Sequence, residues 1–235
     1  MILKDINLSN IKFKINLDTK RPHQKIIYEK GDWEPIVTKA ILKHLKPGML
    51  FIDVGACIGW YTLMAASIVG DNGHVISFEP DPYYFDTLTK NIELNGFTNT
   101  TCSKKAVSDM NGTDFMIVRQ LRTWKEERVA RLLGHEETTQ QGIPVDTTTL
   151  DFFLSDIKRH KVDFVKVDAE GAEEKVLRGM MQTIKKNPHI KIVCEVHSSL
   201  LPLYGTTKQN LFKYISKNLR LKYTHLGATY WIFHS

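Results

Sequence analysis

The fold of this chain is decided by the stretch Phe51-Ile52-Asp53-Val54-Gly55-Ala56-Cys57-Ile58-Gly59-Trp60-Tyr61-Thr62. A short apolar run there ends in an acid and a turn with two glycines, and a helical pattern follows. A second apolar run ends downstream in Ser77-Phe78-Glu79-Pro80. This order predicts a β-strand, a tight turn, a helix and a second β-strand, which is the first half of a nucleotide-type α/β sheet.

The spacing of the glycines restricts the ligand that this turn can bind. They stand as Gly55-x-x-x-Gly59, so the G-x-G-x-x-G fingerprint of dinucleotide folds is absent, and no G-x-x-x-x-G-K-[ST] motif for ATP or GTP follows. A ligand at this turn therefore need not carry a pyrophosphate. S-adenosylmethionine meets that condition, because it has an adenosine and a charged amino-acid end but no phosphate. The alternative is an ordinary βαβ unit with a glycine turn and two exposed acids.

Four residues have predicted roles toward such a ligand. Gly55 allows the backbone to approach the ligand closely, and Gly59 allows the helix to pack against the strand. Asp53, at the carboxyl end of the first strand, is expected to face the ligand's ammonium group, either directly or through water. Glu79, which ends the second strand, is placed to accept two hydrogen bonds from a ribose diol.

A later block strengthens this interpretation. It reads Val165-Lys166-Val167-Asp168-Ala169-Glu170-Gly171-Ala172-Glu173, and together with the first two motifs it resembles the FkbM-type S-adenosylmethionine-dependent methyltransferases. The similarity runs from about Trp33 to Ile192 and includes Asn91-x-x-x-Asn95-Gly96 and Thr149-Leu150-Asp151. The glycine turn alone indicates only a class I methyltransferase, whereas the later block is more specific to the family. Cys57 departs from the pattern, since the family more often has Asn there.

The resemblance implies a cofactor site wider than the turn. It adds the segment Trp33-Glu34, which resembles the part of the family that closes over the cofactor, and Ser108, which stands where an adenine-contacting residue is usual. The implied cofactor-binding residues are Glu34, Asp53, Gly55, Ala56, Gly59, Tyr61, Thr62, Glu79, Pro80, Ser108 and Asp168.

The expected fold is α/β: a single Rossmann-like class I methyltransferase domain with a mostly parallel seven-stranded sheet, a C-terminal antiparallel hairpin and short N-terminal strands. Residues 1–32 are expected to form a β extension with strands at 11–17 and 26–28, and residues 33–235 the methyltransferase domain. Hydrophobic periodicity and turn signals place the further elements. Helices are predicted at 34–45, 59–69, 83–94, from 151, at 173–186 and at 207–218; strands at 49–54, 74–79, 101–107, 113–118, 162–167, 190–196, 220–225 and 229–234.

Composition suits an enzyme of one domain in a reducing compartment. The chain has 235 residues, of which 42% are apolar, enough for one substantial core. No apolar run approaches the ~20 residues of a membrane span, and the N-terminus shows no signal-peptide pattern. The cysteines Cys57, Cys102 and Cys194 are scattered without C-x-x-C spacing, which argues against a zinc site or a disulfide framework. We therefore expect a cytoplasmic protein.

The net charge of +6, from 32 basic and 26 acidic residues, favours anionic partners such as nucleic acid, phosphorylated glycans or membrane surfaces. Simple solubility is the alternative explanation. No compact cluster of arginines and aromatic residues is visible in the sequence. RNA binding therefore remains a minority interpretation.

Candidate catalytic residues follow two strands of the predicted sheet. Asp168 and Glu170 come directly after strand 162–167, beyond whose carboxyl end a ligand's methyl group is expected. The next strand ends in Glu195 and His197, two residues apart and therefore on the same side. Glu173 and Glu174 have the simpler interpretation that they favour a helix N-terminus through its dipole.

Methyl transfer is an in-line displacement in which the protein aligns the partners and removes a proton. His197 is a candidate base because imidazole ordinarily titrates nearest neutrality. Asp168, Glu170 or Glu195 could serve instead or orient the imidazole, and a structural histidine is a further alternative. Asp168, Glu195 and His197 also suit a divalent metal, although their spacing does not require one.

The segment Arg119 to Gly142 is predicted to be an insert that covers the substrate side. Its arginines, Arg119, Arg122, Arg128 and Arg131, could bind an anionic acceptor, because their planar guanidinium groups suit phosphate or carboxylate. A solvated, salt-bridged helix or a homodimer contact is an equal alternative.

The resemblance implies transfer of a methyl group from S-adenosylmethionine to an oxygen acceptor, a hydroxyl of a sugar or other natural product. An RNA methyltransferase is the first alternative, supported by the positive charge alone. A non-catalytic module that binds a nucleotide-like ligand or an assembly partner is the second, and the acids at the strand ends argue against it.

Overall fold

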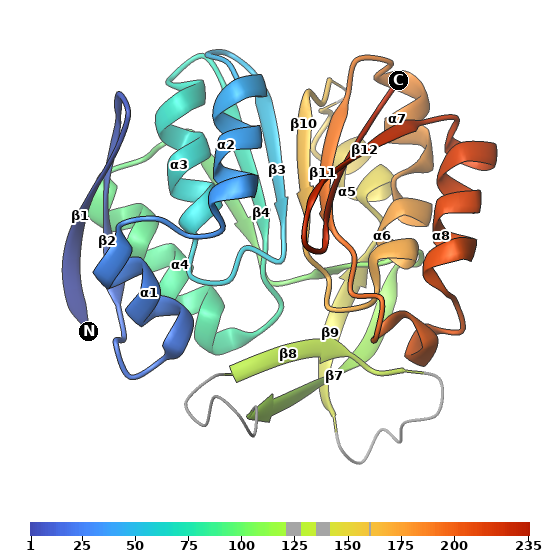
Figure 1. Cartoon of the computed structure of the whole chain (residues 1–235), viewed down its shortest axis with the longest axis horizontal. Helices are drawn as coiled ribbons and strands as arrows, with labels where there is room; N and C mark the ends of the chain where they lie inside the picture. The colour runs from blue at the N-terminus through green and yellow to red at the C-terminus, as the bar shows by residue number, and fades with distance from the viewer. Residues whose placement is uncertain (121–127, 135–141, 160) are drawn as a thin grey trace.

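The computed structural model describes residues 1–120, 128–134, 142–159 and 161–235. At its centre lies a seven-stranded sheet with the order β12-β13-β11-β10-β3-β4-β5 (Figure 1). Its strands are β3 (Leu50–Val54), β4 (His74–Phe78), β5 (Thr100–Ser103), β10 (Phe164–Val167), β11 (Lys191–Glu195), β12 (Lys222–Gly227) and β13 (Tyr230–His234). The first five pair in parallel, and β13 is antiparallel to both of its neighbours, β11 and β12. The predicted sheet and its closing hairpin are confirmed.

Helices cover both faces of this sheet, so its central strands are buried on each side. One face is covered by α2 (Pro35–His44), α3 (Trp60–Val69) and α4 (Pro82–Asn95); the other by α5 (Leu150–Asp156), α6 (Glu173–Gly179), α7 (Met181–Lys186) and α8 (Lys208–Tyr214) (Figure 1). Alternate strand residues enter opposite cores. Phe51 stacks on Phe164 in the first core, with ring centroids 5.6 Å apart, whereas Ile52 and Val165 enter the second.

The predicted helix over 173–186 is divided into α6 and α7. Met180, between them, has φ −120° and ψ 19°. The preceding residue, Gly179, lies so close to the chain after β6 (Ala106–Val107) that a Cβ there would come 2.0 Å from the carbonyl oxygen of Ser108. The helix α8 also continues differently from the prediction, as a π-helical turn over Ile215–Leu219.

The N-terminal segment differs from the prediction in one element. The strand over 11–17 is present as β2 (Ile11–Leu17), and it pairs with β1 (Ile2–Leu8), which we did not predict. The predicted strand at 26–28 is wrong, because these residues belong to helix α1 (Pro22–Lys30). Pro22 presets the first helical turn, and Gly31 ends the helix in the left-handed conformation with φ 68°.

The β1–β2 hairpin shares the core of the main sheet's first face. Phe13 of β2 contacts the Trp60 ring edge-on at 5.4 Å, and Ile6, Ile15 and Leu17 are buried in the same cluster. This shared core does not test the predicted domain boundary at residue 32, which stays a prediction.

A second sheet of four strands lies beyond the carboxyl ends of β3 and β10 (Figure 1). Its order is β6-β9-β7-β8, with β7 (Gly112–Gln120), β8 (Arg128–Leu132) and β9 (Ile143–Thr148). The strand predicted at 101–107 is two strands, β5 and β6, in different sheets. The prediction at 113–118 corresponds to β7, whereas β8 and β9 were not predicted.

The predicted insert, 119–142, therefore begins in β7 and includes β8, and its residues 121–127 and 135–141 lie outside the described part of the chain. None of the helices in the described ranges combines the length and the apolarity that crossing a membrane requires.

Candidate functional site

The turn between β3 and α3 is shaped by its contacts with two neighbouring strands. The backbone N–H groups of Gly55 and Ala56 both donate to the carbonyl oxygen of Phe78, at 3.0 Å. Gly55 has φ 76°, and a Cβ on it would lie 2.0 Å from the carbonyl oxygen of Asp168 at the end of β10. Glycine is thus required for close approach of the turn to the protein's own backbone, a reason that the ligand-based prediction missed.

Gly59 has a packing role, though toward a different element from the one predicted. Its φ is 93°, and a Cβ there would lie 2.7 Å from Cδ1 of Leu88 on α4. Gly59 therefore allows α3 to begin against α4 rather than against the strand.

Cys57, the departure from the family pattern, adopts a left-handed conformation with φ 51°. Asn adopts this conformation more readily than other side chains do, which gives a physical reason for the Asn that is usual here. The Cys57 Sγ atom lies 3.8 Å from Nε2 of His23. Helix α1 thus contacts the turn directly.

Glu79 anchors the turn from the end of β4. One carboxylate oxygen accepts from the N–H of Cys57 at 2.7 Å, and the other accepts from the N–H of Asp81 at 2.9 Å. Burial raises the pKa of Glu79 to about 7. Each oxygen of an ionised carboxylate has a further lone pair, so this side chain can hold the turn and still accept from a ligand hydroxyl.

Asp53 lies beneath the turn and is fully buried. It accepts a hydrogen bond from the Thr62 hydroxyl at 2.7 Å, and that hydroxyl also contacts Ser77 Oγ at 2.7 Å. Burial raises the pKa of Asp53. Its Oδ1 atom has no hydrogen-bond partner among the described residues. Of the two predicted routes to a ligand, this position favours the one through water.

The sequence interpretation missed Lys166, whose side chain is only 6% exposed within β10. Its Nζ donates to the carbonyl oxygen of Gly55 at 2.9 Å and lies 3.4 Å from Asp168 Oδ2 and 3.7 Å from Asp53 Oδ1. Burial lowers its pKa, but Asp168 and Asp53 outweigh burial and raise it. A lysine inside an apolar strand was the available signal, because buried lysines are almost always paired.

Glu34 and Tyr61, which the resemblance implied, lie together beside Lys166. The Tyr61 hydroxyl donates to Glu34 Oε2 at 2.6 Å, and the Lys166 Nζ lies 5.3 Å from the centre of the Tyr61 ring. Burial raises the pKa of Glu34, and a hydrogen bond from Tyr230 of β13 opposes this shift. Tyr230 was not among the predicted residues.

A cavity lies between this turn and the second sheet. It is lined by Gly55, Glu79, Val107, Arg131, Asp168 and Glu170, among others, and Pro80 also lines it. Its volume is about 60 Å³. The residues fit the adenosine end of S-adenosylmethionine in chemistry, since apolar side chains line the cavity beside the Glu79 carboxylate.

The structure does not bring Ser108 and Ala56 into the lining of this cavity. Ser108 is buried, and its carbonyl group faces Gly179 of α6, while the preceding residue, Val107, lines the cavity. Ala56 is buried within the turn. An adenine contact by Ser108 therefore stays a prediction, and Val107 occupies the more direct position.

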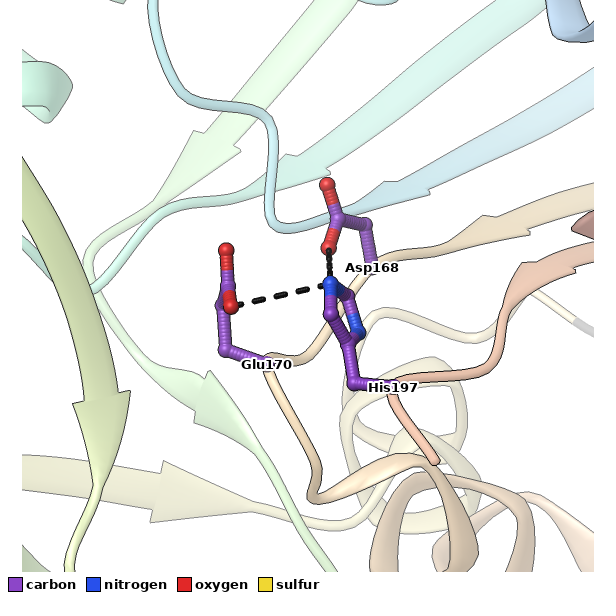
Figure 2. Close-up of side chains that lie close together, drawn as sticks. All are labelled: Asp168, Glu170 and His197. Atoms are coloured by element: carbon purple, nitrogen blue, oxygen red, sulfur yellow. Dashed lines mark ion pairs between the residues drawn. The ribbon is translucent and has the colours of Figure 1, made fainter. Parts of the chain in front are cut away.

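The four predicted catalytic side chains converge at the ends of β10 and β11. His197 Nε2 lies 3.9 Å from Asp168 Oδ1, 3.6 Å from Glu170 Oε2 and 3.5 Å from Glu195 Oε1. Figure 2 shows the ion-pair lines from Asp168 and Glu170 meeting at this nitrogen. The Thr229 hydroxyl donates to the same Glu195 oxygen at 2.9 Å. Convergence follows from the parallel sheet, in which the carboxyl ends of neighbouring strands meet at one edge.

Glu173 orients the histidine, a role that the helix-dipole interpretation did not foresee. It is fully buried, and its Oε1 accepts from the N–H of Gly171 at 2.9 Å and lies 2.7 Å from His197 Nδ1. The second carboxylate oxygen has no hydrogen-bond partner in the described part of the chain. The short contact fixes the ring so that Nε2 faces the other carboxylates.

The electrostatics of this cluster bear on the choice among the predicted bases. Burial lowers the pKa of His197, but the hydrogen bond to Glu173 and the charges of Asp168 and Glu170 outweigh it and raise the pKa to about 10. Burial and the charge of Asp168 raise the pKa of Glu170 and of Glu195 to about 7. In the protein alone, these two carboxyl groups titrate nearest neutrality, and the imidazole is protonated there.

Three of the predicted arginines belong to described strands: Arg119 to β7, and Arg128 and Arg131 to β8. Arg131 is buried and lines the cavity, and its Nη1 donates to the carbonyl oxygen of Leu132 at 3.0 Å. Arg122 lies outside the described residues.

Comparison with known proteins agrees with this geometry. A model of the methyltransferase FkbM domain matches residues 53–219. The chain belongs to the FkbM methyltransferase family. The FkbM match includes the turn, Glu79 and the whole cluster around His197, and it leaves Glu34 outside its N-terminal limit.

Two curated relatives are themselves described as methyltransferases. The hexuronic acid methyltransferase AglP of Haloferax volcanii is 25% identical over 169 residues, which are 72% of this chain and 64% of that protein. The methyltransferase sdnD of Sordaria araneosa is 25% identical over 167 residues, 59% of this chain and 63% of that protein. The chain thus spans less than two thirds of the length of either relative.

Among solved structures, a putative rRNA-methylase from Clostridium thermocellum matches with a TM-score of 0.50 at 12% identity, covering 84% of this chain and 90% of that one. A likeness at this identity shows the fold alone. It confirms the predicted class I methyltransferase fold for this FkbM family member.

Proposed function

We propose that this FkbM family member is an S-adenosylmethionine-dependent O-methyltransferase that acts on a hydroxyl group of a sugar or another natural product. One observation carries the proposal. The backbone of Asp168 contacts the glycine turn at Gly55, while its side chain faces His197, so the predicted cofactor turn and the predicted proton-handling cluster form one site.

The cofactor residues are assigned from their positions around the cavity. Glu79 accepts hydrogen bonds from the ribose hydroxyl groups, and Val107 and Pro80 contact the adenine side. Bound S-adenosylmethionine supplies a methyl group on a positively charged sulfonium. The carboxylates of Asp168, Glu170 and Glu195 give this edge of the sheet a negative potential that favours such a cation.

The chain's own contribution to the reaction is alignment and proton removal. The acceptor hydroxyl lies over the ends of β10 and β11, in line with the bond from sulfur to the methyl carbon. Its proton passes to one of the clustered carboxylates, Asp168, Glu170 or Glu195. The protonated imidazole of His197, whose Nε2 lies 3.5 to 3.9 Å from these three groups, balances their charge and orients them toward the acceptor.

The acceptor enters from the side of the second sheet. Arg131 lines the same cavity as Glu170, and its guanidinium group suits a carboxylate or phosphate on the acceptor. AglP, by its name, acts on a hexuronic acid, an anionic sugar. An anionic sugar is therefore the acceptor class that we put first, and the role of residues 119–142 in covering the substrate side is part of this proposal. A homodimer and a cytoplasmic location stay predictions.

The test is transfer of a labelled methyl group from S-adenosylmethionine to a panel of acceptors: uronic acids, neutral sugars, other hydroxylated natural products and RNA. We expect labelling of a hydroxylated acceptor, in a methyl ether that survives mild alkali, whereas a methyl ester is hydrolysed. Asp168→Asn and Glu170→Gln should lose turnover. Asp86→Asn, an exposed acid on α4, is the matched control and should keep it.

Two results contradict the proposal. Labelling of RNA alone favours the RNA methyltransferase alternative. Full turnover in both cluster variants shows that the catalytic residues lie elsewhere.

A further inference from the structure

We propose that Asp168, Glu170 and His197 form a binding site for a divalent cation of the Mn²⁺ or Mg²⁺ type, whose open coordination positions bind oxygen atoms of the acceptor. The acceptor part of this inference rests on the proposed function. The cation site itself does not, and it can be tested without an acceptor.

The geometry of three ligand atoms is the first support. One oxygen each of Asp168 and Glu170 and one nitrogen of His197 all lie within 4.8 Å of one another. An ion with bonds of about 2.1 Å keeps its ligand atoms roughly 3 to 4.2 Å apart. The distances from His197 Nε2, 3.9 Å to Asp168 and 3.6 Å to Glu170, fall in that range (Figure 2).

The same distances exclude a closed hydrogen-bond network. Both exceed the range of an N–H···O hydrogen bond, so Nε2 makes no hydrogen bond to either carboxylate. Asp168 Oδ1 is buried and has no hydrogen-bond partner among the described residues. An unsatisfied buried oxygen facing a ring nitrogen is stabilised by a group that binds between them, because a buried polar atom without a partner costs free energy.

The orientation of the imidazole is the second support. The Glu173 carboxylate lies 2.7 Å from Nδ1 and is fully buried, so it acts as the acceptor and keeps the proton on that nitrogen. A cation that displaces the proton from Nε2 therefore meets a lone pair directed at Asp168 and Glu170. Histidine ligands of metal ions are commonly held by such a carboxylate on the other ring nitrogen.

The donor set indicates the kind of ion. Two carboxylates and one imidazole, with no cysteine among the three residues, suit a hard or borderline divalent cation rather than a thiolate-bound zinc. Three protein ligands leave positions for oxygen atoms of a vicinal diol or an α-hydroxy acid. Glu195 remains beside the ion, outside the three-residue set, where it can accept the hydroxyl proton.

The test is titration of the metal-free full chain with MnCl₂, in which electron paramagnetic resonance measures the free ion. We expect one Mn²⁺ per chain in the wild type. Glu170→Gln and Asp168→Asn should weaken binding by about 100-fold or more, and Glu173→Gln, which only positions the histidine, by about 10-fold. Glu174→Gln is the matched control. This neighbouring acid on α6 pairs with Arg178 and should leave binding unchanged.

Glu170 is partly exposed, so Glu170→Gln is expected to fold even if substitution of the buried Glu173 prevents folding. Its result therefore remains interpretable. No Mn²⁺ binding at millimolar concentration, or binding that both ligand variants retain, overturns the inference. S-adenosylmethionine titrations on the same samples separate the two proposals. Methyl transfer that persists in the presence of a chelator contradicts the inferred cation and leaves the proposed function intact. Binding of Mn²⁺ without binding of S-adenosylmethionine contradicts the proposed function and leaves the cation site intact.

Discussion

Lys166 holds three groups of the site in place with one ammonium group. It bonds to the Gly55 carbonyl in the turn and neutralises Asp53 and Asp168 on either side. Removal of one partner from a buried set of charges is costly, because the remaining charges keep their desolvation penalty without compensation.

We therefore expect Lys166→Met to lower the free energy of unfolding by about 3–5 kcal/mol in urea denaturation. The double variant Lys166→Met/Asp53→Asn should recover part of this loss, since it removes one uncompensated carboxylate. Lys175→Met is the control, because Lys175 forms a longer pair with Asp114 at 3.8 Å near the surface and should cost less than about 1 kcal/mol. Equal costs for both lysines would contradict the assigned role.

We expect Glu79 to make the affinity for S-adenosylmethionine depend on pH. Burial raises its pKa to about 7 in the protein alone, whereas ribose hydroxyl groups bind the ionised carboxylate best. Binding thus favours the deprotonated form. The affinity for S-adenosylmethionine should rise with pH, by up to about tenfold per unit below pH 7, and become constant above it.

Glu170 and Glu195 titrate in the same range, so the measurement compares the wild type with Glu79→Gln between pH 5.5 and 8.5. The variant should bind more weakly and lose the part of the pH dependence that Glu79 supplies. Identical profiles for the two proteins would show that Glu79 is not the group responsible.

The turn between β3 and α3 depends on one close approach of backbone to backbone. Gly55 and Gly48 have nearly the same φ, 76° and 80°, but a Cβ on Gly55 meets the Asp168 carbonyl, whereas one on Gly48 meets nothing within 4 Å. Alanine variants at the two positions therefore separate the cost of a left-handed backbone, which both share, from the cost of a clash with Asp168, which only Gly55→Ala has.

Gly48→Ala should cost about 1–2 kcal/mol in the free energy of unfolding, the penalty for a left-handed conformation. Gly55→Ala should cost clearly more and should also abolish cofactor binding, because the turn must move away from β10. Urea denaturation and calorimetry measure the two effects. Similar losses in both variants would mean that the contact with Asp168 does not determine the turn.

Elements with a strong local signal could be predicted from the sequence. The strands β3 and β4, the helix α4 with Gly96 after it and the closing hairpin all follow from local patterns. Ile26 to Tyr28 misled the prediction, because a short apolar run suits a strand or a helix, and only Pro22 and Gly31 at its limits indicate α1. The strands β8 and β9 were not predicted, because they are held by pairing with β7 and not by a pattern of their own.

The residues of the site likewise fall into those that could be predicted from the sequence and those that could not. Asp168, Glu170, Glu195 and His197 could be predicted to meet, because all follow parallel strands. The roles of Lys166 and Glu173 could not be assigned, because they depend on partners far along the chain. Glu173 contacts His197, 24 residues away, and Lys166 bonds to Gly55, 111 residues away. The left-handed backbone at Glu170, with φ 49°, could not be predicted from the sequence either.

Across the whole molecule, the N-terminal hairpin and the cofactor turn are connected through one side chain. Asn91 on α4 donates to the carbonyl oxygen of Ile58 in the turn at 2.9 Å and accepts from the N–H of Asn16 on β2 at 2.8 Å. The hairpin therefore supports the turn through α4, while residues of the second sheet line the cavity beside it.

The distribution of charge has a consequence for the ligand. The chain carries a net charge of +6, yet acids are concentrated at the carboxyl ends of β10 and β11. We expect this edge to attract a cationic sulfonium and the remaining surface to attract an anionic acceptor such as the proposed one. The assignment of the whole chain therefore depends on whether an adenosyl cofactor binds at the turn.

Calorimetric titration with S-adenosylmethionine and S-adenosylhomocysteine tests this most directly, with NAD and ATP as control ligands and Glu79→Ala beside the wild type. The account predicts one site that binds the two adenosyl ligands and neither control, and that is lost in a folded Glu79→Ala protein. No binding of the adenosyl pair, or equal binding by the variant, would contradict the assignment of the turn and the catalytic argument that depends on it.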